Sequence, residues 1–141
     1  MKSFVLAMTL VLSASAFANT ATEAVSNLIA SGTYQGKNGA EKCTVSVTTS
    51  TDSVTIAIQD KNNKSDYFSL LNSYTNYNVD AVTGEISASQ KLSFPRYHQG
   101  GSKILNVRGN DKNQVEFFIS QILLDHRGND ASTYAACTVS L

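Results

Sequence analysis

The chain has 141 residues, and its 11 basic and 11 acidic side chains give a formal net charge of zero. This balance removes the electrostatic basis for nucleic acid or an anionic membrane surface as the partner. The length suits one domain that is large enough to bury a hydrophobic core.

The N-terminal residues have the three parts of a secretory signal peptide. Lys2 supplies a positive charge, residues 4–12 form an apolar run, and Ala16-Phe17-Ala18 has the small-x-small pattern of a cleavage site. The apolar run is too short to span a bilayer, and no second run follows it. We therefore expect residues 1–18 to be removed, and the protein to be periplasmic or secreted with no membrane insertion.

The only two cysteines are Cys43 and Cys137. In an oxidising compartment such a pair is expected to form one structural disulfide. Redox-active cysteines are usually close in sequence, and zinc sites need ligands in short pairs. Neither pattern occurs, so we expect a Cys43–Cys137 bond, no metal and no cofactor.

The segment of residues 19–31 is predicted to be an N-terminal helix or arm, with the helix over residues 19–30. Thr20 and Glu23 have the spacing of a capping box. Gly32 can end the helix in a left-handed cap. One apolar stripe at helical spacing consists of Ala21, Ala24, Val25, Leu28 and Ile29.

From residue 32 to residue 141 the apolar period changes to two, which predicts half-buried strands. Residues 43–48 and 54–59 show the alternation most clearly. Turn signals recur at residues 37–39, 51–53, 60–64, 83–84, 99–102, 110–113 and 125–130. Pro95, the only proline, marks an edge, a bulge or a break. The pattern predicts a meander of short antiparallel strands.

The expected disulfide indicates how this meander closes. Cys43 belongs to an early strand and Cys137 to the last, and a disulfide requires Cα atoms within about 7 Å, so we expect the first and last strands to be neighbours. The predicted inward positions are Cys43, Val45 and Val47 on one strand and Cys137, Val139 and Leu141 on the other. A sandwich could also bridge distant strands, although the immunoglobulin pattern expects a tryptophan that this chain lacks.

We expect an all-β, antiparallel up-and-down β-barrel of about eight strands with a short N-terminal helix. The outward strand positions are mostly polar, which favours a soluble barrel over an outer-membrane barrel.

Residues suited to catalysis are few. His98 and His126 are the only histidines, and neither lies in a recognisable catalytic motif. Two groups of Asp and Asn, at residues 60–66 and 125–130, lack the glycine and glutamate spacing of a calcium loop. We interpret them as turn residues and expect the protein not to be an enzyme.

Aromatic residues in the middle of the chain suggest a binding surface instead. Tyr74, Tyr77 and Tyr97 lie among Ser and Asn residues, and Arg96 adds a cation. Tyrosine with small polar residues makes good recognition surface at low entropic cost, although tyrosine is also common in ordinary strands. We take Tyr74, Tyr77, Arg96 and Tyr97 as candidate binding residues.

The start of the strand region resembles calycin-type barrels. Gly32-Thr33-Tyr34 follows a short helix, and an alternating strand with Cys43 comes soon after. Lipocalins begin in this way, and small periplasmic metalloprotease inhibitors have a stretch similar to residues 29–47. Tyr34 stands where tryptophan is usual, and the inhibitors' disulfide is local. The resemblance implies a secreted barrel, and in the inhibitors the segment corresponding to residues 19–30 would reach into a protease cleft.

These observations lead to two hypotheses on function. The first is a secreted or periplasmic, non-catalytic binding protein that contacts a small apolar molecule or another secreted protein at the barrel mouth. The alternative is a proteinaceous inhibitor or envelope interaction module that acts through a surface or through the N-terminal arm.

Overall fold

The computed structural model describes residues 20–62, 64–73, 77–92, 101–124 and 127–141. The predicted signal peptide lies outside these residues. The described elements, in chain order, are α1 (Ala21–Ser26), β1 (Gly32–Asn38), β2 (Glu41–Thr49), β3 (Ser53–Asp60), β4 (Ser65–Leu71), β5 (Tyr77–Val79), β6 (Ile86–Leu92), β7 (Gly101–Gly109), β8 (Gln114–Ile122) and β9 (Thr133–Ser140).

The strands form one antiparallel sheet in the order β4-β3-β2-β1-β9-β8-β7-β6-β5. Every neighbouring pair except β1–β9 is also consecutive in the chain, so the sheet is an up-and-down meander whose first and last strands meet. The predicted all-β barrel is confirmed. The described residues form nine strands, because the three-residue strand β5 separates from β4, and the barrel is nearly closed, with β4 and β5 at the two ends of the sheet order.

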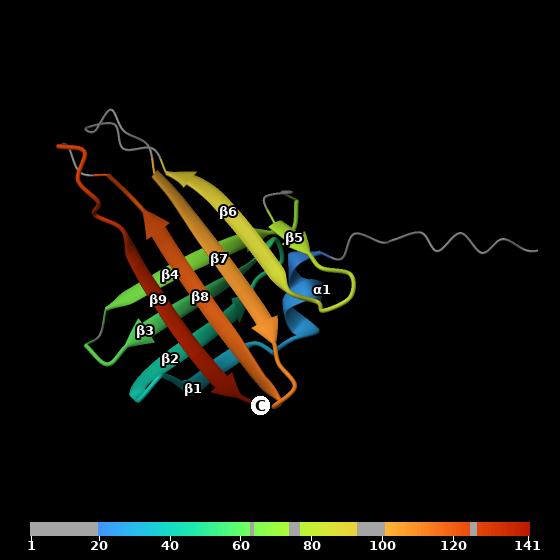
Figure 1. Ribbon diagram of the computed structural model, residues 1–141. Coiled ribbons are helices and arrows are strands. Elements are labelled where there is room, and N and C mark those ends of the chain that lie inside the picture. Colours follow the sequence, from blue (N-terminus) through green and yellow to red (C-terminus); the bar gives the residue numbers. More distant parts are fainter. Residues whose placement is uncertain (1–19, 63, 74–76, 93–100, 125–126) are drawn as a thin grey trace, which may run out of the picture.

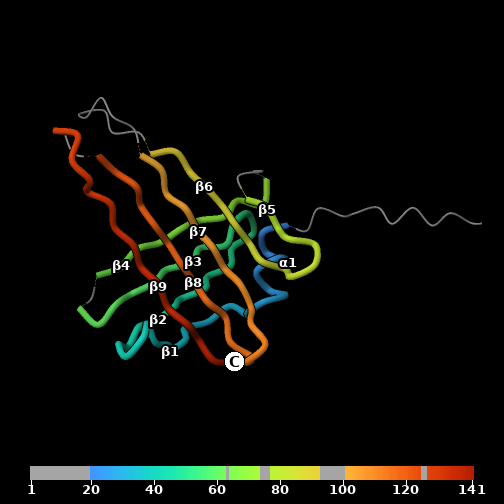
Figure 2. Tube along the Cα trace, in the orientation of Figure 1, coloured from blue at the N-terminus to red at the C-terminus, as the bar shows by residue number. Residues whose placement is uncertain are grey.

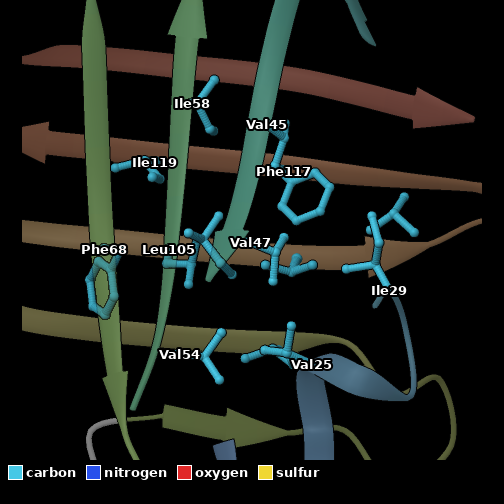
Figure 3. Packing of buried hydrophobic residues seen from close by; sticks show 14 of the residues in the cluster. Val25, Ile29, Val45, Val47, Val54, Ile58, Phe68, Leu105, Phe117 and Ile119 are labelled. Atoms are coloured by element: carbon cyan, nitrogen blue, oxygen red, sulfur yellow. The ribbon is translucent and has the colours of Figure 1, made fainter. Parts of the chain in front are cut away.

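The sheet folds over on itself, so that β1–β4 cross behind β6–β9 (Figures 1 and 2). Side chains from both layers fill the space between them (Figure 3). The largest fully buried ones include Phe68 and Ile56 from one layer and Phe117, Leu105 and Ile119 from the other. All belong to one hydrophobic cluster, so the interior of the barrel is a packed core.

The period-two alternation places the strand side chains as expected at most positions. Cys43, Val45 and Val47 are buried on β2, and Cys137 and Val139 are buried on β9. The prediction is wrong for Leu141, which is 56% exposed. Leu141 lies beyond the end of β9, where its backbone N–H donates to the carbonyl of Asn113 and no layer covers its side chain.

Helix α1 covers one end of the barrel. The capping box is confirmed, because the Thr20 hydroxyl accepts from the Glu23 N–H and the Glu23 carboxylate accepts from the Thr20 N–H. The apolar stripe enters the core through Ala21, Ala24, Val25 and Ile29. The helix is shorter than residues 19–30, since its backbone pattern ends near Ser26. Within the described part of the chain, no helix is long and apolar enough to cross a lipid bilayer.

The Cys43–Cys137 disulfide is present, with a Cα–Cα distance of 5.9 Å. The two cysteines lie on β2 and β9, which are separated in the sheet by β1. Gly36 of β1 pairs with Cys43 on one side and Val139 on the other. A Cβ atom on Gly36 would lie 2.7 Å from the Cys137 sulfur, so the bridge passes over β1 where a side chain is missing.

Candidate functional site

Among the described residues, no element covers the end of the barrel opposite α1. This end holds a groove of about 630 Å³ that we call the mouth groove; its lining includes Glu41, Asp60, Asp66, Gln121, Thr133 and Tyr134. Side chains alternate between the two faces of a strand, and five of these residues lie on the same face as the buried residues of their strands. They therefore continue the inward face of the barrel beyond its apolar core. Tyr134 has the other parity and stands on the rim. The inward face is therefore apolar at the helix end and polar at the mouth.

The carboxylates of the mouth groove already have partners. Asp60 accepts from the backbone N–H groups of Asn62 and Lys64 at 2.8 and 2.9 Å, which stabilises its own turn. Glu41 forms an exposed ion pair with Lys61. Across the described ranges, no three His, Cys, Asp or Glu side chains gather closely enough to hold a metal ion.

Asp66 forms the most enclosed ion pair of the mouth. Its Oδ1 lies 2.5 Å from the Lys103 Nζ, and the two side chains are 17% and 12% exposed. Lys103 also donates to the Tyr67 carbonyl at 2.9 Å, and its ammonium group lies 4.9 Å from the Tyr67 ring centroid. Because Lys103 is on β7 and Asp66 on β4, the pair joins the two layers at the open end.

The same contacts protect an edge strand. β4 stands at one end of the sheet order, where unpaired backbone groups invite association with other strands. At Tyr67 the N–H donates to the Asp66 carboxylate at 2.8 Å, and the carbonyl accepts from Lys103. The floor of the mouth is thus a fixed polar network that also blocks part of this edge.

An exposed aromatic pair borders the mouth groove. Phe118 of β8 and Tyr134 of β9 stack with their ring centroids 6.4 Å apart, and they are 39% and 74% exposed. Their register is diagonal, since Ser120 stands opposite Tyr134 and Phe118 opposite Ala136. Ile122, on the same outer face of β8, is also exposed. Stacked, exposed aromatic rings beside a polar groove are suited to binding a partner.

A charged pair continues this outer face away from the mouth. Arg108 Nε donates to the Glu116 carboxylate at 2.6 Å, and Asn110 donates to the other oxygen at 3.3 Å. The Arg108 hydrogen bond lowers the pKa of Glu116 below its usual range, against a smaller opposing effect of burial. The outer face of β7–β9 therefore carries one satisfied ion pair next to its aromatic residues.

Only one of the four predicted binding residues lies among the described residues, so their assembly at the mouth stays a prediction. Tyr77 lies on β5, half-buried, and packs against the core beside α1 (Figure 1). Tyr74, Arg96 and Tyr97 lie outside the described residues, as do His98 and His126. Of the four candidates, only Tyr77 has a described position, and it is at the covered end of the barrel.

The residues that sequence reasoning missed are Phe118 and Tyr134. Strand parity could have found them, because Val115, Phe117 and Ile119 form the buried set on β8 and leave Phe118 on the opposite face. On β9 the buried Cys137 and Val139 likewise leave Tyr134 outside.

Comparisons with models of protein families, with curated proteins and with solved structures found no match to this chain. The resemblance to calycin-type barrels therefore remains a prediction.

Proposed function

We propose that this chain is a non-catalytic binding protein that works outside the cytoplasm and takes its ligand at the mouth groove. The observation that supports this most directly is the exposed, stacked pair Phe118–Tyr134, of which Tyr134 lines the mouth groove. Large aromatic side chains at interfaces supply contact area at low entropic cost. The disulfide is consistent with an oxidising compartment.

The lining of the mouth groove indicates the kind of ligand. The groove is open and carries charged and amide side chains, including Glu41, Lys64 and Gln121. Sites for small apolar molecules are enclosed and mostly apolar. The barrel interior is occupied by the core, so it offers no alternative volume of that type. A polar ligand with an apolar anchor, such as a segment of another secreted protein, fits the mouth groove better than a small apolar molecule.

The alternative of an inhibitory N-terminal arm has less support. Ala21, Ala24, Val25 and Ile29 are buried in the core. Thr22 is also hydrogen-bonded to Asn72 at the end of β4. A segment held in this way would have to leave the core before it could enter a protease cleft. Exposing Val25 and Ile29 would cost about 1.5–3 kcal/mol for each side chain.

Site-specific photo-crosslinking in the protein's own host tests the proposal. A photo-reactive phenylalanine analogue is placed at position 134, and the matched control is position 82, where Val82 is 93% exposed in the turn after β5. We expect a defined adduct from position 134 alone. The other residues that line the mouth groove stay unchanged in both variants.

A peptide map of the adduct then identifies what was bound. Equal labelling from positions 134 and 82, or no adduct at position 134, would contradict binding at the mouth. The arm hypothesis would be favoured if a photo-reactive residue placed within residues 19–31 gave the adduct and one at position 134 did not.

A further inference from the structure

Two lysines face each other on the outside of the first hairpin. Lys37 of β1 and Lys42 of β2 are direct partners in the antiparallel register. The turn between them contains Gly39 with φ of 61°, a left-handed conformation that glycine adopts easily and that fixes this register. Directly opposed residues have Cβ atoms about 5 Å apart, so their side chains share one space. Both side chains are exposed.

Neither lysine has an ionic partner among the described residues. The ion pairs there use Lys61, Lys103 and Arg108 as their cations. The neighbouring carboxylate Glu41 is held by Lys61, and Glu116, two strands away in the same row, is held by Arg108. Like charges that stand directly opposite each other destabilise a sheet. The hairpin therefore places two like charges side by side, and neither forms an ion pair within the described residues.

The lysines line a groove that also supplies hydrogen-bond donors. This groove, of about 570 Å³, runs over β1, β2 and the ends of β8 and β9, and its side chains include Gln35, Gln114, Thr138 and Ser140. It also passes the backbone of Gly36 and Gly39. None of its lining residues is an aspartate or glutamate. Two ammonium groups, two hydroxyls and two amides without a carboxylate are suited to an oxyanion and unsuited to a cation.

We propose that this second groove, which we call the lysine groove, binds a doubly charged oxyanion, a phosphate or sulfate group, between Lys37 and Lys42. The net charge of the chain does not oppose this, since the site depends on the local arrangement of charges. Lys42 also lines the mouth groove, so the two grooves adjoin at this residue. The proposal stands on its own observations and does not depend on what the mouth groove binds.

A titration with inorganic phosphate, followed by backbone amide chemical shifts at constant ionic strength, tests the lysine groove. We expect saturable shifts at Lys37, Lys42 and Thr138. Unit charges about 4 Å apart in water interact by ~1 kcal/mol, which corresponds to roughly a fivefold change in Kd. Lys37→Gln and Lys42→Gln should each weaken binding by about this factor, while Lys91→Gln, an exposed lysine on β6, leaves it unchanged.

Thermal unfolding gives a second readout that does not depend on the chemical shifts. Phosphate should raise the Tm of the wild type and leave the Tm of the Lys37→Gln/Lys42→Gln variant unchanged, since only a protein that binds the ion gains stability from it. Without phosphate, the double variant should be at least as stable as the wild type, because the repulsion is gone.

Two further experiments distinguish a free ion from an ester group, and the lysine groove from the mouth groove. Glycerol phosphate compared with inorganic phosphate shows whether the group binds free or as an ester. Tyr134→Ala should leave phosphate binding unchanged. The proposal for the mouth groove can therefore fail without affecting the proposal for the lysine groove. Shifts that grow linearly without saturation, or that Lys91→Gln reduces as much as Lys37→Gln does, would overturn the lysine groove.

Discussion

Substitution of Gly36 by alanine tests how the disulfide crosses the sheet. The added Cβ atom would lie 2.5 Å from the Thr138 carbonyl oxygen and 2.7 Å from the Cys137 sulfur. Carbon atoms in favourable contact are about 3.5–4.0 Å from their neighbours, so both atoms would have to move. Neither is the free end of a flexible side chain, since one belongs to the backbone of β9 and the other to the disulfide.

The expected loss of stability in Gly36→Ala is large because the atoms around the added Cβ are rigidly held. Overpacking of a core typically costs about 1–3 kcal/mol, and the rigid neighbours place Gly36→Ala near ~3 kcal/mol. β1 and β9 pair at only two positions, Gly36 with Val139 and Lys37 with Thr138, so the substitution acts on half of that contact. If the disulfide failed to form, a further ~4–5 kcal/mol would be lost, because the bridge closes a loop with a sequence separation of 94.

Urea unfolding with a thiol assay measures both effects. A loss of ~3 kcal/mol should lower the urea midpoint by about 1–3 M at unchanged m. Gly109→Ala on β7 is the matched control, because its Cβ would meet only Leu28 at 3.6 Å, an ordinary contact. The reasoning is refuted if the Gly36→Ala and Gly109→Ala variants have the same midpoint.

Three further predictions concern other contacts. Lys103→Met should lower the free energy of unfolding in urea by about 2 kcal/mol, because it leaves the inward carboxylate of Asp66 without its partner. The Lys103→Met/Asp66→Leu double variant should recover part of this loss. No recovery would contradict the pairing. Hydrogen bonds from the Thr83 N–H, the Thr83 hydroxyl and the Val82 N–H lower the pKa of Asp80, so the stability that they contribute is present above the ordinary carboxyl pKa and is lost as pH falls through the lowered value. The difference in unfolding free energy between the wild type and Asp80→Asn should therefore narrow on acidification, and a constant difference would exclude this origin. Thr20→Ala should cost about 1 kcal/mol in thermal unfolding through loss of the capping box, and Thr20→Ser should not.

Local pattern predicted much of the architecture. The alternation at Val54, Ile56 and Ile58 placed a buried face correctly, because a strand period of two needs only neighbouring residues to be read. The Thr20–Glu23 capping box was likewise a local signal. With two cysteines only one pairing was available, so the disulfide and the meeting of the first and last strands followed from the sequence.

The candidate site depends on contacts that no local pattern contains. Asp66 and Lys103 are 37 positions apart, and they meet only because β4 and β7 end at the same opening. Tyr77 looked like recognition surface by composition, yet the short strand β5 packs it against the core. Phe118 lies between apolar residues in the sequence, and the inward and outward positions of that strand were not assigned separately. The missing information was which strand ends assemble into one rim.

The passage of the disulfide over β1 also constrains how the chain matures. β1 and β2 are adjacent in sequence, so their hairpin can bring Gly36 beside Cys43 before the C-terminal half has docked. Cys137 belongs to the last strand in the chain, so it comes to the same place only when β9 docks beside β1. The native Cys43–Cys137 bond therefore needs β9 in place beside β1, and once formed it holds β1 between β2 and β9.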